Sequence, residues 1–517
     1  MTKTFVDAAM TPTMGRTHNG MPTFTSSGNA LVDLFSAVGS SRGKDITPQF
    51  AAAYAQDRVK ALKIMLWARD IRGGAGERQT VRNLLRFLES QQPEDAEMLI
   101  PYVPFFGRWD DLLVFKTEKM RRAAYSVIAE GLDDKATSGL VAKWMPRKGR
   151  IALELEEFLG LRPTSRNFDY SAGNKAYPAK AYRKMLAELS NVVEQQMCAK
   201  EWNEIVFDHV PSLAAARYQK AFNKHCAERY AAYKAGLVKG TTKINASAVY
   251  PYDVIKSIDS GDAQVAKAQW EALPNFLGDE QILALVDVSG SMTARAGSGN
   301  VTNLQVATSL GLYIADKAKG PFKDCFVTFS GSPKIQVLKG DILSKYAQMC
   351  RSDWQMNTNL MGAFQEILRV GKQHRVADAD MPKILLILSD MEFDCCVSGT
   401  DRRAMTAIRD MYEQAGYTLP KVVFWNLNAR AGNSPVRSHE SGTALVSGFS
   451  PAVMKSILKA QQVEAKDFTP EAVMEETISN ARYDVIDKER KTVHVHMPNT
   501  EGGLKIDRTV RQPINLT

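Results

Sequence analysis

The sequence has little of what marks exported, membrane-spanning or metal-cluster proteins. Its 517 residues contain no run of about 18 apolar residues, the minimum for a membrane-spanning helix. The N-terminus has no basic stretch followed by an apolar one, as an export signal would have. The six cysteines include no C-x-x-C pair, which argues against a zinc cluster and against a disulfide framework. We therefore expect a cytoplasmic protein without a membrane partner.

The bulk composition is that of a globular protein with more than one domain. Hydrophobic residues make up 44% of the chain and charged residues 24%, which are ordinary values for a folded protein. At 517 residues the chain exceeds the length at which a single core stops growing. Two or three domains are therefore expected.

The N-terminal half has the pattern of amphipathic helices separated by Gly, Pro or charged turns, without a fixed repeat length. The clearest expected helices are residues 53–70, 78–90, 121–131, 179–200 and 213–236. This pattern predicts an irregular, HEAT-like helical array, which would form a ring if its two ends met.

After Asn275 the pattern changes to strands that alternate with helices. Strands are expected at 281–288, 325–330, 383–390, 421–426 and 443–447, and helices at 303–319, 359–371, 402–415 and from Pro451. Alternation at this spacing predicts a doubly wound parallel sheet. We therefore divide the chain into an N-terminal segment (1–28), a helical domain (29–275), an α/β domain (276–490) and a C-terminal tail (491–517).

Two apolar runs of the α/β half both lead into an aspartate. Residues 282–286 precede Asp287, and residues 384–388 precede Ser389 and Asp390. Each run has the length and aliphatic content of a strand that is buried on both faces. If the two strands are parallel neighbours, both carboxylates lie at the carboxyl edge of the sheet, where open α/β sheets bind ligands.

Hydroxyl side chains accompany these carboxylates. Asp287, Ser289 and Ser291 alternate along a tight loop, and Thr358 precedes an apolar-periodic stretch between the two strands. Hard oxygen donors of this kind suit Mg²⁺ or Mn²⁺. The sequence therefore predicts a divalent-cation site formed by Asp287, Ser289, Ser291, Thr358 and Asp390. Taken alone, the D-x-S-x-S loop is also compatible with a solvated turn.

The D-x-S-x-S loop, the distant Thr358 and the strand-ending Asp390 resemble the metal-ion-dependent adhesion site of von Willebrand factor A domains. The resemblance assigns the first loop to Asp287, Ser289 and Ser291. The chain departs from the family after Asp390, where Met-Glu-Phe-Asp (391–394) replaces the Thr or Gly of many such domains.

Four segments of the helical half resemble an uncharacterised bacterial and plant family, which is itself similar to the TROVE module of Ro ribonucleoprotein autoantigens. They are 70–78 (Asp-Ile-Arg-Gly-Gly-Ala-Gly-Glu-Arg), 106–112 (Phe-Gly-Arg-Trp-Asp-Asp-Leu), 210–214 (Val-Pro-Ser-Leu-Ala) and 243–246 (Lys-Ile-Asn-Ala). The likeness extends over about residues 19–486. In Ro proteins a ring of helical repeats is closed by an A domain and binds misfolded and structured small RNA, so the resemblance implies RNA binding here.

Basic charge is concentrated in part of the helical half. The net charge is +9, from 66 basic and 57 acidic residues, and residues 101–250 contain 24 Lys or Arg against 16 Asp or Glu. Such a concentration is typical of a phosphate-binding surface. The candidate RNA-binding residues are Lys143, Arg147, Lys148, Arg150, Arg183, Lys184, Arg217, Lys220, Lys224 and His225. The alternative for each of them is a solvated helix face.

Aromatic residues near these cations are candidates for base stacking, with core packing as the alternative. They are Tyr182, Tyr218, Phe222 and Tyr230. The Gly-rich segment 73–76 lacks the Lys-Ser or Lys-Thr of a phosphate loop, so we expect a helix-helix turn there. Asp110 and Asp111 are expected to cap a helix.

Two functions remain open. The first is a noncatalytic RNA-binding protein whose metal loop docks an acidic side chain of a protein partner. The second is an assembly scaffold whose metal site recruits a partner such as an ATPase. No Ser, Cys or Thr has a recognisable base partner, and one cation with mostly neutral ligands suits phosphodiester cleavage poorly, so we expect no enzyme. A ring closed within one chain would make a monomer sufficient.

Overall fold

The computed structural model describes residues 14–162, 178–190, 192–242, 244, 249–259, 263–296, 301–329, 331–352, 358–394, 404–429, 432–460 and 466–486. The expected C-terminal tail, 491–517, lies outside these residues. No helix in the described ranges is long and apolar enough to cross a membrane.

Residues 30–271 form a succession of helices. The α-helices of this half are α2 (Ala30–Val38), α3 (Thr47–Gln56), α4 (Arg58–Arg69), α5 (Gln79–Gln91), α6 (Pro93–Leu99), α7 (Val103–Phe106), α8 (Glu118–Asp133), α9 (Ser138–Trp144), α10 (Arg150–Phe158), α11 (Lys180–Leu189), α12 (Val193–Ala199), α13 (Ser212–His225), α14 (Ala227–Lys239), α15 (Pro251–Asp259) and α16 (Ala263–Glu271). A 3-10 segment, η2 (Trp109–Val114), follows α7. The expected helical array is confirmed.

Three of the expected helices are each divided in two. The break between α3 and α4 lies at Asp57, which is extended and whose carboxylate accepts a hydrogen bond from the Lys60 backbone N–H at 3.0 Å. Such a carboxylate satisfies a free N–H of the first turn and starts a new helix. A second break lies between α11 and α12, and a third at Cys226, between α13 and α14. Because apolar periodicity continues across each break, the sequence pattern did not reveal them.

The C-terminal half contains a six-stranded sheet with the order β5-β4-β3-β6-β7-β8. Its strands are β3 (Ile282–Asp287), β4 (Cys325–Phe329), β5 (Ile335–Val337), β6 (Ile384–Ser389), β7 (Lys421–Asn426) and β8 (Thr443–Ser447). All neighbours are parallel except β5, which runs antiparallel to β4. This is the order of a doubly wound fold, so the expected α/β architecture is confirmed.

Every residue of β3, β6 and β8 is buried, as expected for strands covered by helices on both faces. The helices of this half are α17 (Asn303–Lys317), α18 (Ile342–Cys350), α19 (Leu360–His374), α20 (Ala404–Gln414), α21 (Val453–Ala460) and α22 (Pro470–Ile478). Strand β5 and helix α18 were not expected. The strand has three residues at the sheet edge and only partial burial, which leaves a weak pattern in the sequence.

A short antiparallel hairpin precedes the helices. It consists of β1 (Met14–Arg16) and β2 (Pro22–Phe24). Isolated bridges join Gly20 to Asp394 and Phe24 to Ser434, so the hairpin packs on the α/β half although it lies at the other end of the chain. The sequence pattern did not predict this contact.

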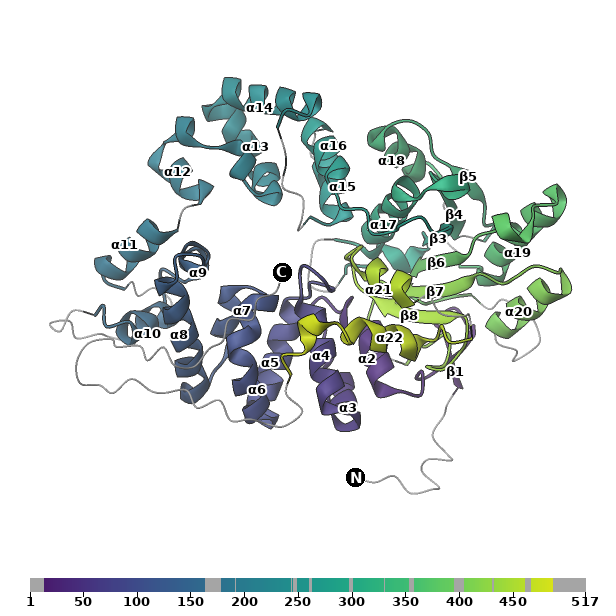
Figure 1. Ribbon diagram of the computed structural model, residues 1–517, viewed down its shortest axis with the longest axis horizontal. Coiled ribbons are helices and arrows are strands. Elements are labelled where there is room, and N and C mark those ends of the chain that lie inside the picture. Colours follow the sequence, from purple (N-terminus) through teal and green to yellow (C-terminus); the bar gives the residue numbers. More distant parts are fainter. Residues whose placement is uncertain are drawn as a thin grey trace.

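The elements form a closed circuit. Figure 1 shows the helices leaving the sheet at α2, following an arc to α11 and returning through α12–α16. Helix α2 packs on β8 at one end of the arc, and α15 and α16 pack on α17 and α18 at the other. One apolar core extends from α2 through α11 and the sheet, whereas α12–α14 enclose a smaller core of their own. The α/β half thus joins the two ends of the helical array.

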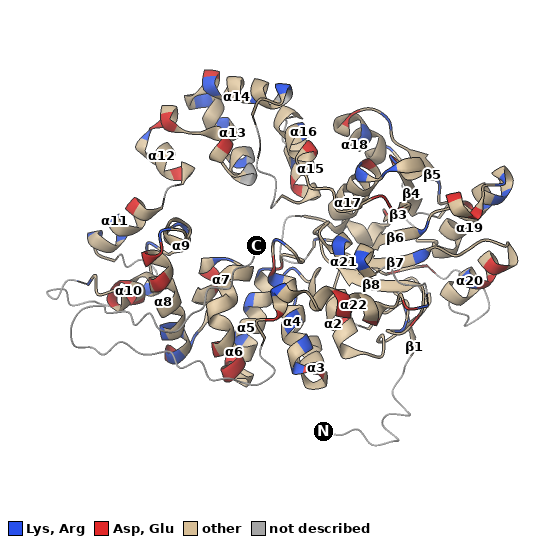
Figure 2. Ribbon diagram, in the orientation of Figure 1, with Lys and Arg blue, Asp and Glu red and all other residues tan. Residues whose placement is uncertain are grey.

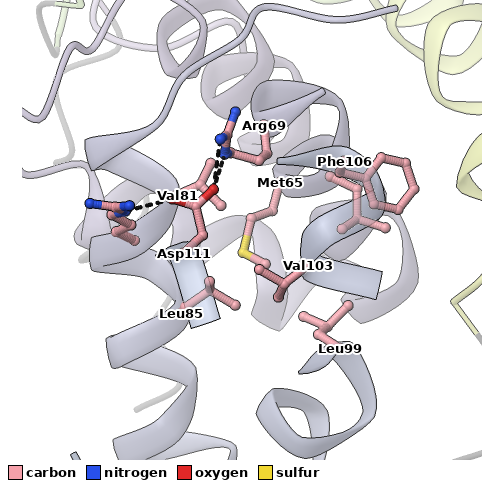
Figure 3. A pocket seen from close by; sticks show the side chains of 10 residues that line it. Met65, Arg69, Val81, Leu85, Leu99, Val103, Phe106 and Asp111 are labelled. Carbon is pink, nitrogen blue, oxygen red and sulfur yellow. Dashed lines mark hydrogen bonds and ion pairs between the residues drawn. The ribbon is translucent and has the colours of Figure 1, made fainter. Parts of the chain in front are cut away.

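A small cavity lies among α4, α5, α7 and η2, lined by apolar side chains and by Arg69 and Asp111 (Figure 3). Its volume is about 20 Å³, enough for about one water molecule. The Arg69 guanidinium donates to Asp111 at 2.6 Å across its wall. The cavity is a packing defect beside a buried ion pair and is too small for an organic ligand.

Candidate cation site and basic surfaces

The two strand-ending aspartates lie at one edge of the sheet. Strands β3 and β6 are parallel neighbours, with Val286 paired to Leu388, so Asp287 lies level with Ser389 and Asp390 lies one residue beyond. The side chains of both residues are buried, at 0% and 1% exposure. In a sheet of this order β3 and β6 flank the point where the connections reverse direction, which is where such folds bind ligands.

The first loop directs oxygen atoms toward one another. The Ser289 N–H donates to Asp287 Oδ1 at 2.9 Å, which tightens the turn into the short 3-10 segment Gly290–Thr293. The Ser289 and Ser291 hydroxyl oxygens are 3.0 Å apart. From the neighbouring strand, the Ser389 hydroxyl donates to Asp287 Oδ2 at 2.5 Å.

The electrostatics of this edge favour a cation. Burial and, after it, the charge of the nearby Asp390 carboxylate raise the pKa of Asp287 from 3.8 to about 7, although the hydrogen bonds from Ser389 and Ser289 oppose this rise. Two buried carboxylates repel each other when both are ionised. A divalent cation between them would remove that repulsion.

The donor set fits a small hard cation. Asp287, Ser289, Ser291, Thr358 and Asp390 offer carboxylate and hydroxyl oxygens, the ligands that Mg²⁺ and Mn²⁺ accept. Within the described parts of the chain, no group of three or more His, Cys, Asp or Glu side chains has the arrangement of a metal site. Any cation here would therefore depend on hydroxyl groups as well as on the two carboxylates.

Thr358 is held by the loop that follows β6. It is fully buried, and its N–H donates to Asp394 Oδ2 at 2.6 Å. Its hydroxyl lies 3.0 Å from the Glu392 carbonyl oxygen and 3.3 Å from Asp394 Oδ1, both of which accept from it. Met391, which lies between Asp390 and Glu392 in this loop, has a left-handed backbone with a φ of 68°.

Residues 392–394 make contacts on both sides of the loop that follows β6. Glu392 accepts the His18 backbone N–H at 2.6 Å, and Asp394 binds Thr358. Phe393 is buried, with Phe329 and Phe424 among its ring neighbours. Sequence reasoning did not assign roles to Glu392 and Asp394. Their position directly after a strand-ending aspartate was the signal available for them.

The candidate RNA-binding residues fall into two groups. Lys143, Arg147, Lys148, Arg150, Arg183 and Lys184 lie on or beside α9, α10 and α11, while Arg217, Lys220, Lys224 and His225 lie on α13. All are exposed except the half-buried Lys143. Helices α9 and α13 occupy separate parts of the circuit (Figure 2), so the sequence cluster is two surfaces.

Several of these cations already have protein partners. Arg150 pairs with Glu154 at 2.7 Å and Lys184 with Glu188 at 3.4 Å. Arg147 donates to the Ser190 hydroxyl at 3.2 Å. The His225 ring stacks on Trp202, with 4.4 Å between ring centroids. Exposed ion pairs of this kind are weak and exchange readily with an incoming phosphate.

Most of the expected stacking residues are core residues. Tyr182, Phe222 and Tyr230 have 0% exposure, so the base-stacking interpretation is wrong for them. Phe222 and Tyr230 pack on Phe207 in the core of α12–α14. Tyr218 is half-buried and donates to Glu194 at 3.1 Å.

A further basic surface was missed by sequence reasoning. Arg78, Arg82 and Arg108, with Asp110, Asp111 and Trp144, form what we call the arginine cluster. The Arg108 guanidinium lies 3.4 Å from the Trp144 ring centroid, and the Lys143 ammonium lies 5.6 Å from the same ring. Arg82 pairs with Asp110 at 2.8 Å and with Asp111 at 2.6 Å.

Arg78 is the exposed member of this cluster. Burial lowers the pKa of Arg78, and the positive charges of Arg108 and Arg82 lower it further. Since Asp111 also binds Arg69, four arginines share two carboxylates, and basic charge is in excess. The expected capping role is confirmed for Asp111, which accepts the Arg108 N–H at 2.9 Å.

Two family models match the chain. Residues 17–104 and 162–283 match a family described as a domain of unknown function, DUF2828. Residues 281–498 match another domain of unknown function, DUF7788. The two matches meet at the start of β3.

The chain is similar in sequence to a viral protein and in fold to a bacterial one. The chain is 27% identical over 507 residues to "Uncharacterized protein L728" of Acanthamoeba polyphaga mimivirus, covering 86% of this chain and 85% of that protein. Its fold is similar to the crystal structure of the RO (RSR) protein of Deinococcus radiodurans, with a TM-score of 0.43, 15% identity, and coverage of 88% of this chain and 100% of that one. Neither the family descriptions nor the viral protein's name states a function.

Proposed function

We propose that this protein is a noncatalytic, RNA-binding component of a ribonucleoprotein. Its helical half binds small structured or misfolded noncoding RNA, and its α/β half binds Mg²⁺ or Mn²⁺ at the sheet edge. The cation then docks an acidic side chain of a protein partner. RNA is held through phosphate charge, shape and base stacking, with little reading of sequence.

The observation that carries the RNA assignment is the arginine cluster. Arginine binds phosphate through its planar fork of donors, and an arginine stacked on an indole offers a flat surface for a base. Trp144 and Arg108 have that arrangement, and the exposed Arg78 lies in the same excess of positive charge. The exposed Lys148 follows α9 and extends the basic surface from Lys143.

The composition supports the same proposal. The net charge of +8 in residues 101–250 lies within the helical half, and protein surfaces of that sign attract polyanions from solution. Four helical segments resemble an uncharacterised family that is itself similar to the TROVE module, and this likeness also favours RNA over another polyanion.

The cation assignment concerns Asp287, Ser289, Ser291, Thr358 and Asp390. The cation would supply a point of attachment for a carboxylate from another protein. We propose no hydrolytic role, because a single ion held mostly by neutral hydroxyl oxygens is poorly suited to activating water against a phosphodiester.

The RNA assignment is tested by removing charge from the basic surface. In the variant Arg78→Gln, Lys143→Gln, Lys148→Gln, we expect affinity for the small RNA that copurifies with the wild type to fall at low salt. The slope of log affinity against log salt should become shallower by about 2, since each phosphate contact contributes about 0.7 for single strands. Filter binding across a salt series measures both quantities.

The matched control removes the same charge elsewhere. Lys319→Gln, Lys339→Gln, Lys372→Gln changes three exposed lysines of the α/β half, and it should leave both affinity and slope close to wild type. Equal losses in the two triple variants would mean that net charge alone attracts RNA. A wild type with no copurifying RNA and no salt-dependent binding would refute the assignment in favour of a protein scaffold.

A further inference from the structure

The turn of the N-terminal hairpin is fixed to the loop that follows β6. The Thr17 hydroxyl donates to the Phe393 carbonyl oxygen at 2.6 Å, and the His18 N–H donates to Glu392 Oε2 at 2.6 Å. The Asn19 side-chain amide donates to the Glu392 carbonyl oxygen at 2.7 Å. These bonds join residues about 374 positions apart in the sequence.

The same loop fixes Thr358. Asp394 accepts the Thr358 N–H at 2.6 Å, and its own N–H donates back to the Thr358 carbonyl oxygen at 3.0 Å. The Asn19 amide also lies 3.4 Å from the Thr358 hydroxyl oxygen. Hairpin, loop and threonine therefore belong to one hydrogen-bond network.

This network sets which part of the threonine hydroxyl remains for a cation. A hydroxyl has one hydrogen and two lone pairs, and a cation needs a lone pair. The Thr358 hydrogen has the Glu392 carbonyl and the Asp394 carboxylate as acceptors, at 3.0 Å and 3.3 Å. A carboxylate that accepts from a ligand hydroxyl fixes its rotamer and makes its oxygen a better donor to the metal.

We infer that the N-terminal hairpin, residues 14–24, is part of the cation site, and that Asn19 and Asp394 are positioning residues for Thr358. This inference rests on the cation site proposed above. Asp394 orients the hydroxyl directly. Asn19 acts one step further out, because it fixes the loop carbonyl that accepts from the same hydroxyl. The N-terminal hairpin thereby completes a site whose other residues lie between positions 287 and 394.

The alternative is that the hairpin competes with the cation. If the Asn19 amide occupied the lone pair that a cation needs, removing it would strengthen cation binding. The two possibilities predict opposite signs, so one titration separates them.

The test is a calorimetric titration of the full-length protein with Mn²⁺. We expect Asp394→Asn to raise the Kd for Mn²⁺ about tenfold or more, within the range of about 10–100-fold for outer-shell partners of metal ligands. Asn19→Ala should also raise the Kd, but by a smaller factor. His18→Ala is the matched control, because His18 is exposed and contributes only its backbone N–H, and it should leave the Kd unchanged.

A second measurement follows from reciprocity. If the hairpin strengthens cation binding, the cation must stabilise the docked hairpin by the same factor. Hydrogen exchange of the His18 and Met21 amides should therefore slow when Mn²⁺ is added to the wild type, and should respond less in Asn19→Ala. Melting temperatures of the metal-free variants identify any that fail to fold, and Asn19, which is exposed, provides a second variant should Asp394→Asn do so.

The outcomes separate the inference from the proposal beneath it. If neither the wild type nor Asp287→Ala binds Mn²⁺, the cation site is refuted and the inference with it. Suppose that the wild type binds Mn²⁺, that Asp287→Ala loses this binding, and that Asp394→Asn and Asn19→Ala retain the wild-type Kd. The cation site then stands, and the inference about the hairpin is overturned. Tighter binding in Asn19→Ala identifies the hairpin as a competitor and also overturns it.

Discussion

Asp287 shows how one buried carboxylate links metal binding to stability. It has no exposed surface, and burial followed by the charge of Asp390 raises its pKa from 3.8 to about 7. Between these pH values the folded protein retains a proton that the unfolded chain has released. Raising the pH through this window therefore costs the metal-free folded state stability, which is the reverse of the usual behaviour of an aspartate.

The first prediction at this scale is a pH dependence of the melting temperature. In EDTA, the wild type should lose stability between pH 4 and pH 7, by a few kcal/mol if about 1.4 kcal/mol accompanies each unit of pKa difference. Asp287→Asn, which keeps the shape without the charge, should flatten this part of the profile. Added Mg²⁺ should stabilise the wild type more at pH 8 than at pH 5, because the cation binds the ionised carboxylate.

Asp279→Asn serves as the control, because this carboxylate is 83% exposed and pairs only at the surface with Lys319. Its profile should follow the wild type. A wild-type profile that rises with pH in EDTA, or an Asp287→Asn profile as steep as the wild type, would contradict the assigned environment of Asp287.

At the scale of elements, the Gly-rich turn between α4 and α5 is a packing device. The expected helix-helix turn is confirmed, and its glycines allow close contact with other segments. A Cβ at Gly76 would lie 2.0 Å from the Tyr250 hydroxyl, beside α15, and a Cβ at Gly74 would lie 1.9 Å from the Trp67 carbonyl oxygen. Gly76 also has a φ of +72°, which side chains disfavour.

The prediction for this turn separates strain from contact. Gly76→Ala should lower the free energy of unfolding by about 2–4 kcal/mol, from backbone strain and overpacking together. Gly160→Ala has a similar φ of +66°, and no described residue lies within 4 Å of the added methyl group, so a loss of about 1 kcal/mol is expected. Chemical denaturation measures both. Equal losses in the two variants would show that the contact with Tyr250 contributes nothing.

At the scale of the whole molecule, a half-buried arginine joins three parts of the circuit. Arg42, from the connection between α2 and α3, pairs with Glu77 at 3.2 Å. Its guanidinium lies 4.2 Å from the ring of Phe449, after β8, and 6.0 Å from that of Tyr252, on α15. Burial raises the pKa of Glu77, and Arg42 opposes that rise. Both ends of the helical array and the sheet therefore meet at this ion pair.

Breaking the pair should loosen the closure of the circuit. Arg42→Met leaves the Glu77 carboxylate buried without its partner, so we expect the free energy of unfolding to fall by about 3–5 kcal/mol. Hydrogen exchange should accelerate in α15. Adding Glu77→Gln to Arg42→Met removes the unpaired buried charge and should restore part of the lost free energy of unfolding.

Arg369→Met breaks an exposed pair with Glu366 on α19 and should lower the free energy of unfolding far less, because exposed ion pairs contribute little to stability. If Arg42→Met were no more harmful than this control, or left exchange in α15 unchanged, the ion pair at Arg42 would not hold the circuit together.

The sequence predicted the parts of the fold whose burial is uniform. Strands β3 and β6 are apolar at every position because helices cover both faces, and each was located within about a residue or two of its bounds. It failed where local patterns are continuous across a change of direction, as at Asp57 and Cys226. It also failed at β5, which is short and half-exposed at the sheet edge.

Site residues follow the same division. The sequence placed Asp287 and Asp390 at the sheet edge because each follows a recognisable strand. The arginine cluster was missed because Arg78, Arg108 and Trp144 are separated in sequence and each is unremarkable alone. The stacking role expected for Tyr182, Phe222 and Tyr230 was wrong, since the same aromatic side chains serve equally well as core residues.

By itself, the sequence determined the two halves of this protein, the parallel sheet and the pair of aspartates at its edge, because strand burial and strand ends are written in local residue patterns. Only the tertiary structure decided that the helical array closes on the sheet and that residues 17–19 meet residues 392–394. It also decided that four arginines gather around two carboxylates. These contacts join segments tens to hundreds of residues apart, and their free energy depends on which distant side chains become neighbours, which no local pattern contains.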